Sequence, residues 1–182
     1  IIIGHSLGGK VAMNLGCRSN IKFSKLIIAD IAPKKYSIDF HKNILEYLSS
    51  ISIKEFSSRV QIDEILSLEI KDFSVRQFLM KNLYRDKNKE FNWRFNIMVL
   101  KEKLDNISDV DFLNKQINIP TLFIKGENSN YINDEDKQVI STYFLNFEIK
   151  TIENSGHWIH AEQPDFFFEN VMKFIAPELN CL

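Results

Sequence analysis

The feature that most constrains the fold of this chain is a glycine-rich turn that directly follows an apolar run. Residues 1–3 are isoleucine, residues 4–9 read Gly-His-Ser-Leu-Gly-Gly, and residues 10–15 look helical. A strand, a tight turn and a helix in direct succession predict a nucleophile elbow, in which Ser6 projects at the top of a sheet. We expect Gly4 and Gly8 to be required, because the positions that neighbour such a turn must lack bulk.

The simpler interpretation of residues 4–9 is an ordinary glycine-rich turn, since short glycine patterns recur by chance. The apolar run before the turn and the helix after it favour the elbow. In that geometry the N–H of Leu7 points to where an oxyanion forms. Ser6 is therefore the candidate nucleophile, and the backbone N–H of Leu7 is the candidate oxyanion donor.

The position of this turn is as informative as its content. The chain has no initiator methionine, and its first residue already lies inside the predicted strand. Several strands precede the nucleophile in enzymes with this elbow, and an unpaired hydrophobic strand edge is a poor start for a domain. We expect the chain to be an N-terminally truncated fragment that lacks a second oxyanion donor. In isolation such a fragment should be inactive and aggregation-prone.

The composition is that of an ordinary globular protein, with 45% hydrophobic and 26% charged residues among 182. The formal net charge of −1 gives no electrostatic argument for a nucleic acid or an anionic membrane as partner. No apolar run approaches the roughly 20 residues of a membrane span. Cys17 and Cys181 offer neither metal-ligand spacing nor a disulfide framework, which favours a cytoplasmic protein without metal or cofactor. We expect Cys17 to pack in its helix and Cys181 to be a free thiol.

Short apolar segments alternate with helical patterns in two parts of the chain. Each apolar segment is followed by turn or loop residues, as is typical of buried parallel strands. This alternation predicts an α/β fold with a mostly parallel sheet and crossover helices. The strands are expected at 1–3, 25–29, 121–125 and 147–152, and the helices at 10–18, 135–144 and 166–175.

The stretch between Tyr36 and Ile119 has no convincing strand and contains several amphipathic runs. An all-helical insertion in an α/β pattern is most simply a cap over the strand ends, where ligands bind in such sheets. The alternative is a set of crossover helices without a functional role. The runs are 40–48, 53–60, 61–69, 75–83 and 95–104, and the expected division is core 1–36, cap 37–118 and core 119–182.

A serine nucleophile needs an adjacent base, and four histidines are available. His157 lies in a loop between the last strand and the final helix, where Pro164 is well placed in the first turn. We therefore expect His157 to be the base. His160 is interpreted as structural, His5 as a residue that shapes the pocket, and His41 as ordinary surface.

The acid is expected between Ser6 and His157, because this elbow uses the chain order serine, carboxylate, histidine. Asp30 ends an apolar strand, where a charge is costly unless it is paired or hydrated. A hydrogen bond to the far nitrogen of His157 would satisfy it. The simpler interpretation of Asp30 is a turn-forming residue before Pro33. We favour Asp30 as the acid and keep Glu127, which follows a later strand, as the alternative.

Five segments carry a family resemblance, namely residues 4–10, 28–33, 93–96, 126–131 and 155–158. Together they resemble the α/β-hydrolase superfamily, and more narrowly the small bacterial YbfF-type esterases and their mitochondrial relatives. The resemblance runs through essentially the whole chain. In that branch Ser129 stands where hydrolases usually carry the acid, and the acid follows the strand after the nucleophile helix, which corresponds to Asp30.

The resemblance implies a serine hydrolase that cleaves carboxylic esters of short to medium acyl chains, with a small-molecule ester or thioester as substrate. Trp93 and Phe95 match a cap motif and either line the acyl pocket or pack the cap's own core. Trp158 and His5 are further pocket candidates. The same residues would serve a thioesterase, an amidase, a C–C hydrolase or an acyltransferase. A non-catalytic binding module of the same fold is the alternative from another class.

Overall fold

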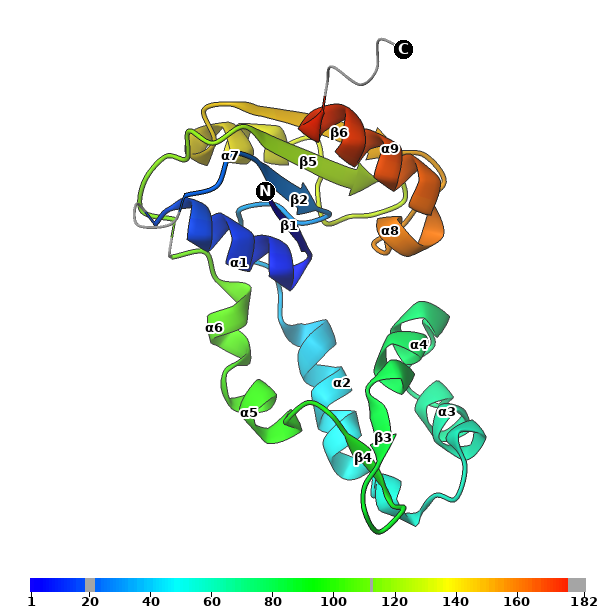
Figure 1. The fold of residues 1–182 in the computed structure, drawn as a ribbon. Helices are drawn as coiled ribbons and strands as arrows, with labels where there is room; N and C mark the ends of the chain where they lie inside the picture. Colours follow the sequence, from blue (N-terminus) through cyan, green and yellow to red (C-terminus); the bar gives the residue numbers. More distant parts are fainter. Residues whose placement is uncertain (19–21, 112, 177–182) are drawn as a thin grey trace. The chain divides into compact units, whose positions relative to one another are not determined.

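The chain folds into two compact units, one made of residues 1–35 and 109–182 and the other of residues 36–108. We call them the core unit and the cap unit, because the second interrupts the first in the sequence. Figure 1 labels the helices and strands of both units. The computed structural model describes residues 1–18, 22–111 and 113–176.

The cap unit ends earlier in the sequence than predicted, at Ser108 rather than at residue 118. The segment that follows belongs to the core unit because it pairs there. The N–H of Ile117 donates to the carbonyl of Tyr143 at 2.7 Å, and Ile117 forms an isolated parallel bridge with Phe144.

Four parallel strands form the sheet of the core unit, in the order β1-β2-β5-β6 (Figure 1). All four strands predicted from the sequence are present, with small shifts at their ends. The register places His5 beside Ala29, and Ala29 beside Ile124, so that the carboxyl ends of these strands meet at one edge. The strands are β1 (Ile2–His5), β2 (Leu26–Ala29), β5 (Thr121–Gly126) and β6 (Phe147–Ile152).

Helices cover both faces of this sheet, as the predicted α/β class requires. On one face, Ile27, Leu122 and Ile152 form a buried cluster with Val171 of the last helix. On the other face, the Phe123 ring lies edge-on to Phe144 with 5.0 Å between ring centroids. The helices of the core unit are α1 (Leu7–Gly16), α7 (Asp136–Tyr143), α8 (Ile159–Glu162) and α9 (Pro164–Ile175).

Several local predictions for the core unit are confirmed. Pro164 occupies the first turn of α9, where its missing N–H costs nothing. Cys17 is a buried free cysteine at the end of α1. Cys181 lies outside the described residues. Across the described ranges, no helix is both long and apolar enough to cross a membrane.

The cap unit has its own core, built around Leu48, Ile62 and Leu66. Most of it is helical, but it also contains an antiparallel pair of short strands. Its elements are α2 (Asp39–Ser50), η1 (Ile53–Glu55), α3 (Arg59–Ser67), α4 (Phe73–Lys81), β3 (Leu83–Arg85), β4 (Phe91–Trp93), α5 (Ile97–Glu102) and α6 (Leu104–Ser108).

The expectation of an all-helical cap is therefore wrong, and the turn between β3 and β4 explains why. The Asp86 side chain accepts hydrogen bonds from the N–H groups of Asn88 at 2.9 Å and Glu90 at 3.1 Å. Lys89 adopts a left-handed conformation with φ 64°. An aspartate that bonds the backbone ahead of it closes a hairpin without a Gly-containing turn signal.

The expected helix over residues 53–60 is also wrong. A short 3-10 turn, Ile53–Glu55, replaces it, and α3 begins only at Arg59. Ser58 and Gln61 form a capping box, in which each side chain binds the backbone N–H of the other residue. A box of this kind starts a helix after its serine, so residues 56–58 stay extended or bent.

Candidate active site

Ser6 lies in the turn between β1 and α1 and has a strained backbone. Its φ is 52° and its ψ is −121°. Its N–H donates to the carbonyl of Ala29 at 2.9 Å, and its own carbonyl accepts from the N–H of Gly9 at 2.8 Å. A non-glycine residue held at positive φ is typical of an active-site turn, and a nucleophile elbow requires this strand-to-helix reversal.

The elbow needs glycine at two positions, one of which was not predicted. A Cβ on Gly4 would lie 2.2 Å from the carbonyl oxygen of Gly8, and one on Gly9 would lie 2.4 Å from the side chain of Ile31. A Cβ on Gly8 would meet nothing within 4 Å. The steric expectation for Gly8 is therefore wrong, since the close approach is made by its neighbour Gly9, which faces the sheet.

Leu7 opens helix α1, directly after Ser6. The N–H groups of Gly9 and Lys10 bind the Ser6 carbonyl at 2.8 and 3.3 Å. The N–H of Leu7 lies in the first turn, where helical N–H groups have no carbonyl to bind within the helix. Its role as an oxyanion donor stays a prediction.

Asp30 and His157 are joined by a hydrogen bond. Nδ1 of His157 lies 2.8 Å from Oδ2 of Asp30, whose side chain is fully buried. Asp30 follows β2 with φ 50°, a conformation that aspartate tolerates better than most residues. Its carboxylate also accepts from the N–H of Gly126 at 3.2 Å and from the Ser129 hydroxyl. The buried carboxylate is thus satisfied by three donors, one of which is the predicted nitrogen of His157.

Glu127, the alternative acid, binds elsewhere. Its Oε2 accepts a hydrogen bond from the N–H of Asn154 at 2.9 Å, and the side chain is exposed. This bond ties the loop after β5 to the loop after β6. The geometry therefore favours Asp30 over Glu127 as the partner of His157.

The imidazole of His157 is partly shielded, with 19% of the side chain exposed. The ring of Tyr131 stacks on it, with 3.9 Å between centroids and 19° between planes. Burial, and secondarily the charge of Asp30, raises the pKa of Tyr131, so the phenol stays neutral beside the carboxylate. The neutral phenol ring therefore covers one face of the imidazole.

His5 contacts the loop that carries His157. Its Nε2 lies 2.8 Å from the carbonyl oxygen of His157, and its ring centroid lies 4.7 Å from that of His157 and 5.5 Å from that of Trp158. Burial lowers the pKa of His5 to about 4, mainly through loss of hydration, with the neighbouring histidines adding to the effect. His160 joins the cluster at 4.7 Å from His5.

The aromatic residues predicted for the pocket lie in two different units. Trp158 belongs to the loop that carries His157, in the core unit. Trp93 and Phe95 stack on each other at 5.4 Å in the cap unit, half-buried against its core. Both rings pack against that core, and their role in a pocket stays a prediction. His41 is exposed in α2, as expected.

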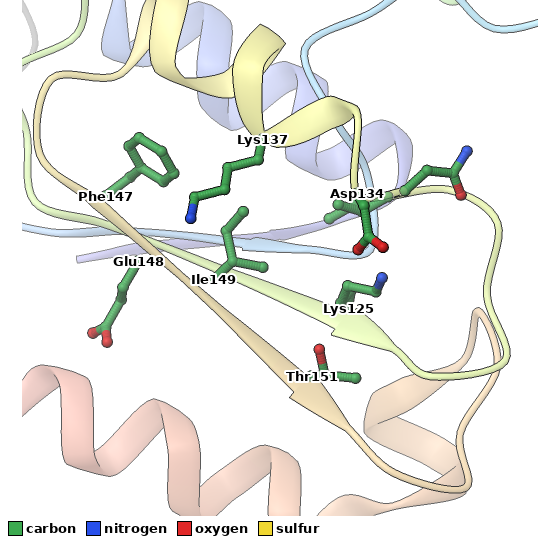
Figure 2. A pocket seen from close by; sticks show the side chains of 9 residues that line it. Lys125, Asp134, Lys137, Phe147, Glu148, Ile149 and Thr151 are labelled. Carbon is green, nitrogen blue, oxygen red and sulfur yellow. The ribbon is translucent and has the colours of Figure 1, made fainter.

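A separate hollow of about 520 Å³ lies between α7 and the edge strand β6 (Figure 2). Lys125, Asp134, Lys137 and Glu148 are among the residues that line it, and the carboxylate of Glu148 points away from Lys137 (Figure 2). None of the three residues predicted to be catalytic lines it. It is distinct from the strand ends where Asp30 and His157 meet.

Sequence reasoning missed several residues that shape the site. Gly126 lets the loop after β5 lie against the base loop, because a Cβ there would be 2.1 Å from the carbonyl oxygen of Gly156. Tyr131 stacks on the base, and Glu162 accepts hydrogen bonds from the N–H groups of Gly156 and Trp158. A glycine that ends a buried strand, as Gly126 does, is the one signal that could have been read.

The parallel sheet, the strained elbow and the carboxylate–histidine pair at its carboxyl edge define the class of protein. The chain belongs to the α/β-hydrolase superfamily, and its esterase relatives confirm the predicted family and fold. No protein-family model matches the sequence.

Three relatives describe this membership more closely. A Haemophilus influenzae protein, whose esterase/lipase activity is itself a proposal, is 38% identical over 175 residues, covering 96% of this chain and 60% of its own length. Esterase YbfF of Escherichia coli is 30% identical over 173 residues, which cover 95% of this chain and 66% of the length of YbfF. The solved structure of a marine microorganism esterase is 38% identical, with a TM-score of 0.87 over 94% of this chain and 68% of its own. The chain thus spans about three fifths to two thirds of the length of these curated relatives.

Proposed function

We propose that the full-length protein carrying this sequence hydrolyses carboxylic esters through Ser6, His157 and Asp30. The observation that carries the proposal is the 2.8 Å bond between His157 and a fully buried Asp30, at the sheet edge where the strained Ser6 follows β1. The names of the relatives, an esterase/lipase and two esterases, support ester hydrolysis in general. Short to medium acyl chains are the substrates expected from the family resemblance.

In the proposed reaction, Nε2 of His157 accepts the hydroxyl proton of Ser6 as Oγ attacks the ester carbonyl. Asp30 holds Nδ1–H and stabilises the imidazolium that forms. The N–H of Leu7 donates to the oxyanion of the tetrahedral intermediate. The intermediate collapses as His157 passes its proton to the leaving alcohol. Water then attacks the acyl-Ser6 ester by the same route and releases the acid.

The test compares the wild type with Ser6→Ala and a matched control, Ser141→Ala, in the full-length protein. Ser141 is an exposed serine in α7, whose hydroxyl donates to a backbone carbonyl. Hydrolysis of p-nitrophenyl butyrate and labelling by a fluorophosphonate probe should both be lost in Ser6→Ala and kept in Ser141→Ala. Absence of a probe adduct at Ser6 in the wild type would overturn the proposal and favour a non-catalytic binding module.

A further inference from the structure

The backbone on both sides of His157 is held by two side chains. The carboxylate of Glu162 accepts hydrogen bonds from the N–H groups of Gly156 and Trp158, at 2.6 and 3.2 Å. The carbonyl oxygen of His157 accepts a hydrogen bond from Nε2 of His5 at 2.8 Å. Two backbone N–H groups and one backbone carbonyl of residues 156–158 are therefore all held by hydrogen bonds to side chains.

These two contacts come from very different places in the chain. Glu162 lies in α8, immediately after the loop, so its bonds shape the loop locally. His5 is the last residue of β1 and the direct neighbour of Ser6. Its bond therefore joins the strand that carries the nucleophile to the loop that carries the base. Asp30, in contrast, acts on the imidazole ring of His157 from β2.

The protonation state of His5 suits this contact. A carbonyl oxygen can only accept, so Nε2 of His5 carries the hydrogen. Since burial lowers the pKa of His5 to about 4, the ring is neutral at the pH where serine hydrolases work. A charged ring 4.7 Å from His157 would oppose the positive charge that His157 gains in the reaction. A neutral donor fixes the loop without that opposition.

We propose that His5 is a positioning residue, whose Nε2–H donor fixes the carbonyl of His157 and thereby the separation of Ser6 from the imidazole. The reaction that it serves is the proposed function, on which this inference rests. His5 acts through His157 and not on the substrate, which differs from the pocket role expected from the sequence.

Two substitutions separate the hydrogen bond from the ring. His5→Phe keeps an aromatic ring and removes the donor, whereas His5→Gln keeps a donor nitrogen at the same bond distance from Cβ and removes the ring. Because small misplacements of a reacting group lower turnover steeply, we expect His5→Phe to reduce kcat about tenfold or more. KM should change less than about twofold, since substrate contacts are untouched. His5→Gln should retain kcat within about threefold of the wild type.

His41→Phe, in an exposed histidine of the cap unit, is the matched control and should leave kcat and KM unchanged. A rise in KM at constant kcat in His5→Phe would assign His5 to the substrate pocket and overturn the inference. Equal losses in His5→Phe and His5→Gln, in proportion to the folded fraction measured by circular dichroism, would reduce His5 to a packing residue.

A measurement without substrate keeps this inference separate from the proposed function. The Nδ1 proton that His157 shares with Asp30 should give a low-field proton resonance in the NMR spectrum of the wild type. That resonance should be kept in His5→Gln, broadened or shifted in His5→Phe, and absent in Asp30→Asn. If the resonance behaves in this way in the three variants but the wild type hydrolyses no ester, the proposed function fails and the positioning role stands. If His5→Phe leaves the resonance unchanged, the positioning role fails.

Discussion

Asp30→Asn is the substitution with the sharpest predicted outcome, because the structure shows where the new amide group must point. Oδ1 of Asp30 accepts from the N–H of Gly126, and Oδ2 accepts from both Ser129 and His157. An asparagine has one oxygen and one NH2 group to replace the two carboxylate oxygens. One of the two positions must therefore become a donor.

The backbone decides which position changes. The N–H of Gly126 cannot turn into an acceptor, so the amide oxygen must stay opposite it. The NH2 group then faces Ser129, whose hydroxyl can rotate, and His157, whose imidazole can change tautomer. His157 would carry its proton on Nε2 and could no longer accept one from Ser6. In the best-studied serine protease the equivalent change lowers kcat by about 10⁴, and we expect about 10³–10⁴ here.

The assay is kcat for p-nitrophenyl butyrate in the full-length protein, with Glu127→Gln as the matched carboxylate-to-amide control. The Glu127 side chain is exposed and accepts a hydrogen bond from the N–H of Asn154, which glutamine can also accept, so kcat should stay within about threefold. Thermal melting should show both variants folded. The assignment of the acid is refuted if Asp30→Asn keeps more than about a tenth of the wild-type kcat. It is also refuted if Glu127→Gln loses more of its kcat than Asp30→Asn does.

Two further predictions concern stability. Gly4→Ala should lower the free energy of unfolding, measured by urea titration, by about 1–3 kcal/mol or prevent folding, because its Cβ would lie 2.2 Å from a backbone oxygen. Gly8→Ala should be tolerated in the same titration, because its Cβ would meet nothing within 4 Å. Because of His5, the free energy of unfolding should decrease as the pH is lowered from 6.5 to about 4. In this range the unfolded chain takes up a proton on His5, whereas the folded ring stays neutral beside His157, His160 and Asp30. After allowance for partial exposure the loss is about 1–2 kcal/mol, and urea titrations of wild type and His5→Gln should converge toward the acid end; parallel curves would contradict it.

The sequence could indicate which candidate residues lie near one edge of the sheet, because these residues follow strands. Ser6, Asp30 and His157 each follow a short apolar segment, and the carboxyl ends of parallel strands meet at one edge. Local pattern therefore implies spatial proximity in this fold. The same logic places Glu127 at that edge, and only the structure shows that its carboxylate turns to Asn154.

Features that depend on tertiary contacts escaped prediction. The strands β3 and β4 are three residues each and give no periodic signal, and their turn is closed by the Asp86 side chain. The need for glycine at position 9 arises from Ile31, which approaches from the loop after β2. The hydrogen bond from His5 spans 152 positions in the sequence and leaves no local pattern.

The serine at position 129 and the aspartate at position 30 are best understood as one arrangement. Ala29 pairs with Ile124, so the loops after β2 and β5 leave the sheet side by side. The loop after β5 supplies the Gly126 N–H and the Ser129 hydroxyl to the carboxylate of Asp30. A second carboxylate at position 129 would stand in contact with the first, and two adjacent carboxylates cannot both stay ionised. A hydroxyl there, in contrast, replaces the water that a fully buried Asp30 has lost. A buried carboxylate at position 30 therefore requires a neutral donor at position 129.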